Sequence, residues 1–127
     1  MKEATQKLLD KAARVLKIAE RLRAEEDGEF AVGRAYYAMF YTAEALLNEK
    51  GHRFRKHSGV HSAFREHFVR NGLLAGKYHR WLLEAFSQRI TGDYGIDSDL
   101  TAEDAAVLIS QAREFLKAAT QFLEKKE

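Results

Sequence analysis

Residues 30–47, FAVGRAYYAMFYTAEALL, constrain the fold of this chain more than any other stretch. They contain only two charged side chains, Arg34 and Glu44, and no proline. A helix of this composition has apolar side chains around most of its circumference, so it needs neighbours on most sides. The stretch therefore predicts a central helix that other helices surround.

At 100° per residue, this helix divides into two arcs. The first arc is almost wholly apolar and is expected to face the core: Val32, Ala35, Tyr36, Met39, Phe40, Ala43, Leu46 and Leu47. The second arc combines one cation and two phenols with small or polar residues: Arg34, Tyr37, Ala38, Tyr41, Ala45 and Asn48. We expect Tyr37, Ala38, Tyr41 and Ala45 to form a packing or dimer face, because small residues beside rings allow close contact. The alternative is that this arc belongs to a ligand site.

Apolar residues spaced by three and four predict further helices over residues 5–23, 58–70 and 75–90, and another that starts at Thr101. Ser58 is the expected N-cap of the third helix, and Thr101 with Asp104 resembles a capping box. No stretch reads as a strand, and the connections are short. The expected fold is all-α: one domain, residues 1–127, forming an up-down antiparallel bundle of four main helices with a shorter helix at 58–70.

Composition excludes several classes of function. The chain has no cysteine, so disulfides and thiol chemistry are absent. The first residues lack the apolar core of a signal peptide, and no apolar run approaches the roughly 20 residues that span a membrane. There is no phosphate-binding GxxxxGK[ST] loop and no Rossmann-type strand–helix pattern. We therefore expect a cytoplasmic protein with no membrane partner and no cofactor.

Charge is unevenly distributed along the chain. Residues 51–80 hold seven Lys or Arg residues and only one acid, Glu66. All five histidines of the chain lie in the same segment. Residues 81–127 hold five basic and nine acidic residues. The basic segment can attract phosphate groups, and Arg53, Arg55, Lys56 and His57 are its candidate nucleic-acid-binding or nucleotide-binding residues, together with Arg34. The alternative is that the basic segment meets the acidic half of this chain or of a second subunit.

Four of the histidines, His52, His57, His61 and His67, lie close together in the sequence. His57 and His61 have the four-residue spacing of metal ligands on a helix. No carboxylate pattern completes a site, so no metal is expected, and the histidines are interpreted as exposed or capping.

The segment RITGDYG at residues 89–95 is the second group with potential chemistry. Arg89 and Asp93 lie one helical turn apart, so they are expected to form an ion pair that fixes the helix end. A guanidinium can also hold a phosphate through two bonds. Tyr94 could then stack on a base or bond to the phosphate.

Three motifs in order resemble the HEPN domain family: GRAYYAMFYTAEALL at 33–47, KHSGV at 56–60 and RITGDYG at 89–95. The similarity is greatest to small stand-alone bacterial and archaeal HEPN proteins, and it spans nearly the whole chain. This resemblance implies a helical bundle that is usually dimeric. Such proteins are often encoded beside a minimal nucleotidyltransferase, and some members are RNases.

In the wider family the RNase signature is an Arg, four to six residues, and then a His. Arg89 matches the Arg, but Asp93 and Tyr94 stand where the His would fall. Arg89, Asp93 and Tyr94 are the catalytic candidates by this resemblance, and the missing His weakens the expectation of catalysis because neither replacement titrates near neutral pH as His does.

Three functions follow as hypotheses. The first is an RNA-binding or nucleotide-binding partner of a minimal nucleotidyltransferase in a toxin–antitoxin-like two-gene system, acting as a homodimer. The second is an RNase toxin for which Arg89 is essential. The third is a non-catalytic dimerising scaffold.

Overall fold

The computed structural model describes residues 1–96 and 98–125. These residues form five α-helices, with a π-helical turn, η1 (Arg65–Val69), that continues α3. No strand occurs among them. The helices are α1 (Glu3–Ala24), α2 (Gly28–Glu49), α3 (His57–Phe64), α4 (Lys77–Tyr94) and α5 (Ala102–Lys125). The predicted all-α fold is confirmed.

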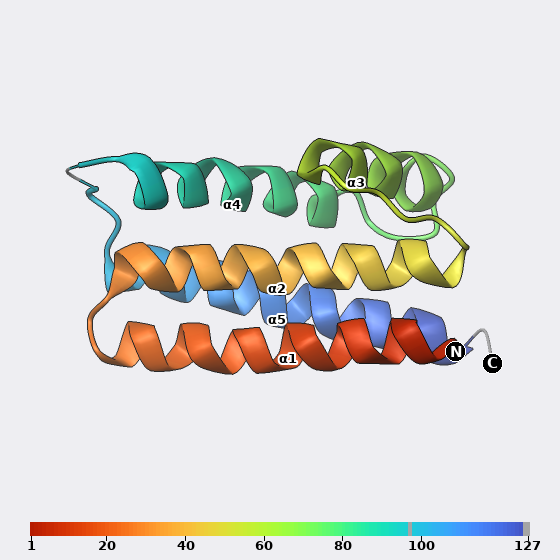
Figure 1. Cartoon of the computed structure of the whole chain (residues 1–127), viewed down its shortest axis with the longest axis horizontal. Coiled ribbons are helices and arrows are strands. Elements are labelled where there is room, and N and C mark those ends of the chain that lie inside the picture. The colour runs from red at the N-terminus through yellow and green to blue at the C-terminus, as the bar shows by residue number, and fades with distance from the viewer. Residues whose placement is uncertain (97, 126–127) are drawn as a thin grey trace.

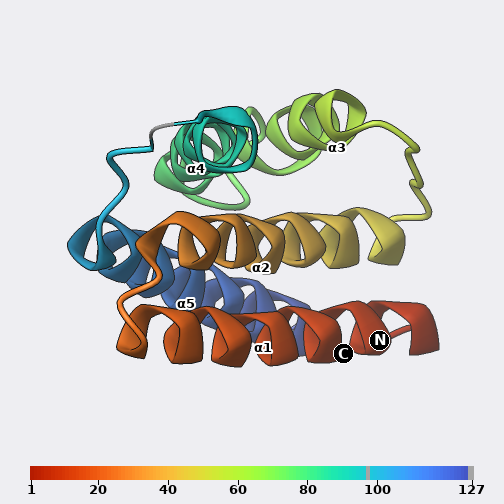
Figure 2. The same cartoon turned by 60° about the vertical axis from the view of Figure 1, so that its left-hand side comes forward.

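Helix α2 occupies the centre of the bundle. The four long helices alternate in direction, so α2 is antiparallel to both α1 and α4 (Figure 1). On one side α2 packs against α1 and α5, and on the other against α4 and α3 (Figure 2). None of the helices in the described part of the chain is long and apolar enough to cross a membrane.

Local hydrogen bonds define where the helices begin. The Asp27 carboxylate accepts the Phe30 backbone N–H at 3.2 Å and caps α2. The predicted capping box of α5 is present: Asp104 N–H donates to Thr101 Oγ1 at 3.1 Å, and Thr101 N–H donates to Asp104 Oδ2 at 2.9 Å. Both caps lie at the end of the bundle where α4 finishes (Figure 1).

Two helix boundaries differ from the prediction. The predicted N-cap at Ser58 is wrong, because Val60 N–H already bonds to the carbonyl of Lys56 and the helix begins at His57. The last turn of α4 extends to Tyr94, so Asp93 and Tyr94 are helical and not part of a loop. This extra turn places Asp93 beside α2, where a Cβ on Gly33 would lie 3.7 Å from Asp93 Oδ1.

Two glycines allow three helix ends to approach closely. A Cβ on Gly28 would lie 2.3 Å from the carbonyl carbon of Thr101, just before α5. A Cβ on Gly92 would lie 2.9 Å from the carbonyl oxygen of Glu29. A side chain at either position would force the backbones apart. The start of α2 is therefore held against the start of α5 and the last turn of α4.

The predicted core arc of α2 is confirmed, because all eight of its residues are buried. The opposite arc is only partly available to another molecule. Ala38 and Ala45 are fully buried within the protomer, since α1, α4 and α5 all pack on α2. The packing alternative therefore holds for these two alanines, and their assignment to a dimer face is wrong. Tyr37 and Tyr41 remain half-buried at the surface.

Candidate functional site

A buried tyrosine links the central helix to two histidines. Tyr36 of α2 is fully buried, and its hydroxyl lies 2.7 Å from Nδ1 of His57 and 2.9 Å from Nε2 of His61. Both histidines belong to α3, and their four-residue spacing places them on one face of that helix. The interpretation of the histidines as exposed or capping is wrong for His61, which is only 5% exposed.

Aromatic rings enclose this trio. The His57 ring stacks on Phe40 with a centroid distance of 4.2 Å. The ring centre of Phe86 on α4 lies 5.3 Å from that of Tyr36 and 5.0 Å from that of His61. His61 and Tyr36 are therefore shielded from water, whereas the His57 ring reaches the surface and is half-buried.

Burial shifts the titration of all three groups. It raises the pKa of Tyr36 far above its usual value, so the phenol keeps its proton. Burial, followed by the nearby His57 and His79, lowers the pKa of His61 to about 4. Burial and then the charge of Arg89 lower the pKa of His57. Both imidazoles are therefore mainly neutral at neutral pH.

Arg89, in the last turns of α4, lies at the edge of the same cluster. Its Nε is 2.9 Å from Asp93 Oδ2, which confirms the predicted ion pair. The Nε–H is buried and is not aligned on that oxygen as a hydrogen bond, so its donor capacity is unused. The guanidinium lies 5.2 Å from the centre of the Tyr37 ring.

A second guanidinium contacts the same ring. Arg34 of α2 also lies 5.2 Å from the Tyr37 ring centre, and no acidic partner for it occurs in the described residues. Such contacts hold cations in place without neutralising their charge. Because Asp93 is the only acid paired with either arginine in the described chain, the two arginines keep a net positive charge here. The local chemistry suits an anion.

The structure brings together only some of the predicted site residues. Arg34, Tyr37, His57, Arg89 and Asp93 converge where α2, α3 and α4 meet. The others lie apart from this junction: Arg53 donates to Asn48 Oδ1 at 3.2 Å near the end of α2, Arg55 and Lys56 are exposed in the connection before α3, and Tyr94 is 75% exposed.

Comparison with known proteins identifies the family. The HEPN domain model matches residues 5–125. The chain belongs to the HEPN family. It is 40% identical over 119 residues to a UPF0332 protein of Gloeobacter violaceus, covering 93% of this chain and 94% of that protein. It is 34% identical over 122 residues to a protein of Methanocaldococcus jannaschii named "Putative toxin", and the match covers 96% of this chain and 83% of that protein. A UPF0332 protein of Thermotoga maritima is 38% identical over 114 residues, covering 90% and 86%.

This HEPN chain has no histidine at the expected place after Arg89, yet a histidine lies near Arg89 in space. Both His57 and Arg89 contact the ring of Tyr37: the centre of the His57 ring lies 5.8 Å from the centre of the Tyr37 ring, and the Arg89 guanidinium lies 5.2 Å from it. In the sequence, His57 belongs to the basic segment, and no local pattern connects it with Arg89. The four-residue spacing of His57 and His61 is the one signal in the sequence for this site, and it is also the spacing of metal ligands on a helix.

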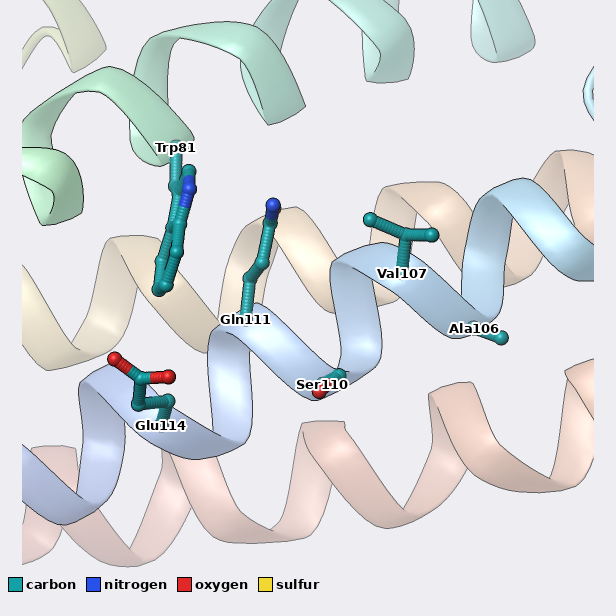
Figure 3. A pocket seen from close by; sticks show the side chains of 6 residues that line it. All are labelled: Trp81, Ala106, Val107, Ser110, Gln111 and Glu114. Carbon is teal, nitrogen blue, oxygen red and sulfur yellow. The ribbon is translucent and has the colours of Figure 1, made fainter.

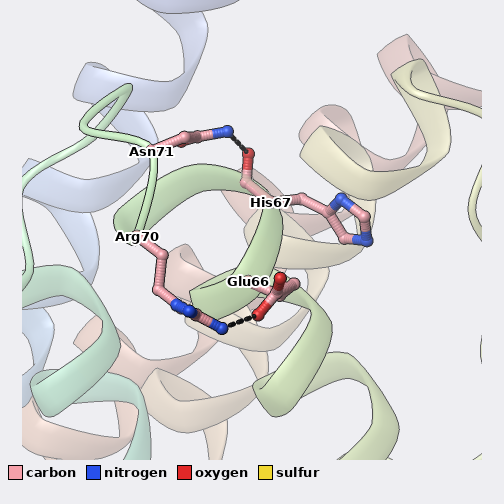
Figure 4. Close-up of polar contacts among 4 residues, drawn as sticks. All are labelled: Glu66, His67, Arg70 and Asn71. Atoms are coloured by element: carbon pink, nitrogen blue, oxygen red, sulfur yellow. Dashed lines mark hydrogen bonds and ion pairs between the residues drawn. The ribbon is translucent and has the colours of Figure 1, made fainter.

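Some residues of the basic segment are paired with acids within this HEPN domain. Arg70 pairs with Glu66 at 2.6 Å, and Asn71 Nδ2 donates to the carbonyl of His67 at 2.7 Å (Figure 4). Lys77 pairs with Glu114 of α5 at 2.6 Å. The alternative that basic residues meet the acidic half of the same chain therefore holds for Lys77.

A groove between α4 and α5 is a further candidate surface of the HEPN domain. It has a volume of about 420 Å³, and Trp81 and Gln111 reach into it from the two helices (Figure 3). Glu114 is the one charged residue in its lining, and that carboxylate is already paired with Lys77. This groove lacks a cation of its own for a phosphate, so the junction around Arg89 is the better candidate for nucleic acid.

Proposed function

We propose that this HEPN protein binds RNA through the junction of α2, α3 and α4, with Arg89 as the group that holds a backbone phosphate. The observation that carries the proposal is the pair of arginines, Arg34 and Arg89, on one tyrosine ring beside a single carboxylate. A guanidinium stays charged and grips phosphate with two parallel bonds.

The cellular role proposed is that of the toxin-like half of a two-gene system. Two supports bear on it: the resemblance to stand-alone HEPN proteins encoded beside a minimal nucleotidyltransferase, and two relatives named "Putative toxin". Expression of this chain alone is expected to slow the growth of the host cell. Co-expression of an adjacent nucleotidyltransferase gene is expected to relieve that effect, and a growth rate that neither gene alters would contradict the role.

RNA binding is tested by fluorescence anisotropy with a labelled single-stranded RNA at low and moderate salt. Arg89→Gln is expected to weaken binding about tenfold or more, since a hydrogen-bonded charged contact contributes roughly 1.5–3 kcal/mol. The matched control is Arg80→Gln, which removes an exposed arginine of the same helix that is paired with Glu84. Arg80→Gln is expected to retain nearly full affinity.

Asp93→Asn separates a binding role for Arg89 from a structural one. If Arg89 holds phosphate, removing the neighbouring negative charge strengthens binding, because a carboxylate repels the ligand. If Arg89 only fixes the helix end, Asp93→Asn lowers stability and leaves RNA affinity unchanged. Equal affinity of wild type, Arg89→Gln and Asp93→Asn would contradict the proposal.

A further inference from the structure

The hydroxyl of Tyr36 has one proton and meets two ring nitrogens. It can donate to one nitrogen, and it must accept from an N–H on the other. Two arrangements of the neutral trio satisfy both contacts. In the first, Tyr36 O–H donates to His61 Nε2, and His57 Nδ1–H donates to the Tyr36 oxygen. In the second, His61 Nε2–H donates to the Tyr36 oxygen, and Tyr36 O–H donates to His57 Nδ1.

Only the first arrangement tolerates both protonation states of His57. In it, Nδ1 carries a proton throughout, so Nε2 can gain or lose a proton with no change at Tyr36. In the second, a proton added to His57 Nδ1 would point at the Tyr36 hydroxyl hydrogen, which already points at Nδ1 across the 2.7 Å contact. His61 is buried and neutral, so its Nε2 can accept this bond while Nδ1 carries the proton, as the first arrangement requires. The chain from His61 through Tyr36 thus leaves a lone pair on His57 Nε2.

His57 Nε2 is the free end of this chain. The His57 ring makes a single hydrogen bond to the described residues, through Nδ1. The ring is half-buried, whereas His61 and Tyr36 are enclosed. His57 and Arg89 both contact the Tyr37 ring, so a phosphate bound at Arg89 would bring its adjoining sugar to the neighbourhood of His57.

We propose that His57 is a catalytic general base of this site, taking a proton from the ribose 2′-hydroxyl next to a phosphate held by Arg89, and that Tyr36 and His61 are positioning residues for it. This inference rests on the proposed RNA binding. It assigns to α3 the imidazole that the segment after Arg89 does not contain.

The step balances without any further reactant. His57 Nε2 takes the proton of the 2′-hydroxyl, and the oxygen's electron pair forms a new bond to phosphorus. The bond from phosphorus to the 5′-oxygen breaks, its electron pair stays on that oxygen, and water supplies a proton to it. The products are a 2′,3′-cyclic phosphate and a 5′-hydroxyl, and His57 returns its proton to solvent. A positioned base of this kind contributes about 100-fold to 10,000-fold in rate.

The groups around His57 set the direction of the pH dependence. Tyr36 and Tyr37 face it from α2, His61 from α3, Arg89 from α4, and Lys56 precedes it in the chain. Burial and Arg89 both disfavour the imidazolium, so the pKa of His57 lies below 6.5. The base form therefore predominates at neutral pH, and cleavage is expected to fall only as pH drops below that value.

The test uses a labelled single-stranded RNA and the whole chain, with cleavage and binding measured on the same samples. His57→Gln is expected to reduce cleavage about 100-fold or more, with RNA affinity within about twofold of wild type. The matched control is His67→Gln, which removes a histidine on η1 that stacks on His52 away from the site. A substrate with a single 2′-deoxynucleotide should be resistant at that position.

Tyr36→Phe tests the positioning role and keeps the packed ring. In this variant the imidazolium of His57 has no oxygen to accept from its Nδ1–H, so the pKa of His57 falls further. The pH at which cleavage begins to decline therefore moves to a lower value. The rate at neutral pH is expected to be about tenfold lower. A purely structural role for Tyr36 would lower the rate without moving the pH at which cleavage begins to decline.

The outcomes separate the two proposals. Cleavage that depends on His57 supports the inference. RNA binding with no cleavage, or cleavage that His57→Gln does not alter, overturns it and leaves the binding function standing. Failure of wild type to bind RNA overturns the proposed function and, with it, this inference.

Discussion

The hydroxyl of Tyr36 lies 2.7 Å from Nδ1 of His57, although 21 positions separate the two residues in the chain. This contact joins the buried face of α2 to the first turn of α3. It ties a packing residue of the core to a ring at the surface, so stability and the proposed chemistry of the site depend on the same hydroxyl.

We expect Tyr36→Phe to lower the free energy of unfolding by about 1–3 kcal/mol. The phenylalanine ring fills the same space, but His61 Nε2 loses its partner in a buried position. Urea unfolding followed by circular dichroism measures the change. Tyr94→Phe is the control, because Tyr94 is 75% exposed, and it is expected to change stability by less than about 0.5 kcal/mol.

Phe115→Ala is expected to destabilise the fold by about 3–5 kcal/mol. The Phe115 ring is fully buried on α5 and contacts Tyr78 and Phe64, each at 5.2 Å. Thermal or urea denaturation measures the loss. Val107→Ala on the same helix removes a side chain that is 56% exposed, and a similar loss there would show that burial is not the cause.

Stability is expected to rise with pH between about 4 and 6.5. The pKa of His61 is about 4 in the folded protein against 6.5 for an unperturbed histidine, so the unfolded chain binds more protons in this window. The folded state therefore loses stability as pH falls through it, by up to about 1.4 kcal/mol per pH unit from this residue. The lowered pKa of His57 likewise makes the folded protein less stable as pH falls.

Urea unfolding at a series of pH values measures this slope. His61→Gln is expected to flatten it, whatever its effect on stability at pH 7. A slope that His61→Gln does not alter would mean that other groups dominate.

The homodimer predicted from the sequence remains a prediction. Tyr41 is half-buried, with Lys11 Nζ 4.5 Å over its ring, and it is available to a second chain in a way that Ala38 and Ala45 are not. Tyr41→Glu is expected to shift a dimer towards monomer at tens of micromolar, as measured by light scattering, because a symmetric contact repeats the added charge. The control is Ser110→Glu at an exposed position on α5, which is expected to leave the balance of dimer and monomer unchanged. Monomeric wild type would contradict the prediction.

Periodicity predicted the helices and the core because these depend on neighbours in the sequence. The buried arc of α2, the capping box of Thr101 and the pair Arg89–Asp93 all follow from spacings of three or four residues. The contact of Tyr36 with His57 depends instead on how α3 packs across α2, which no local pattern encodes. Ala38 and Ala45 were misplaced for the same reason, since periodicity shows an arc but not which helices cover it.

The start of α1 and the end of α5 lie together at one end of the bundle, and the last turn of α4 lies at the other (Figure 1). A fluorophore or purification tag joined to either of those helix ends would therefore sit far from Arg89 along the bundle axis. The protein could be tethered to a surface by that end with the arginine pair away from that surface, so that single-molecule experiments can test the proposed RNA binding without altering any residue of the site.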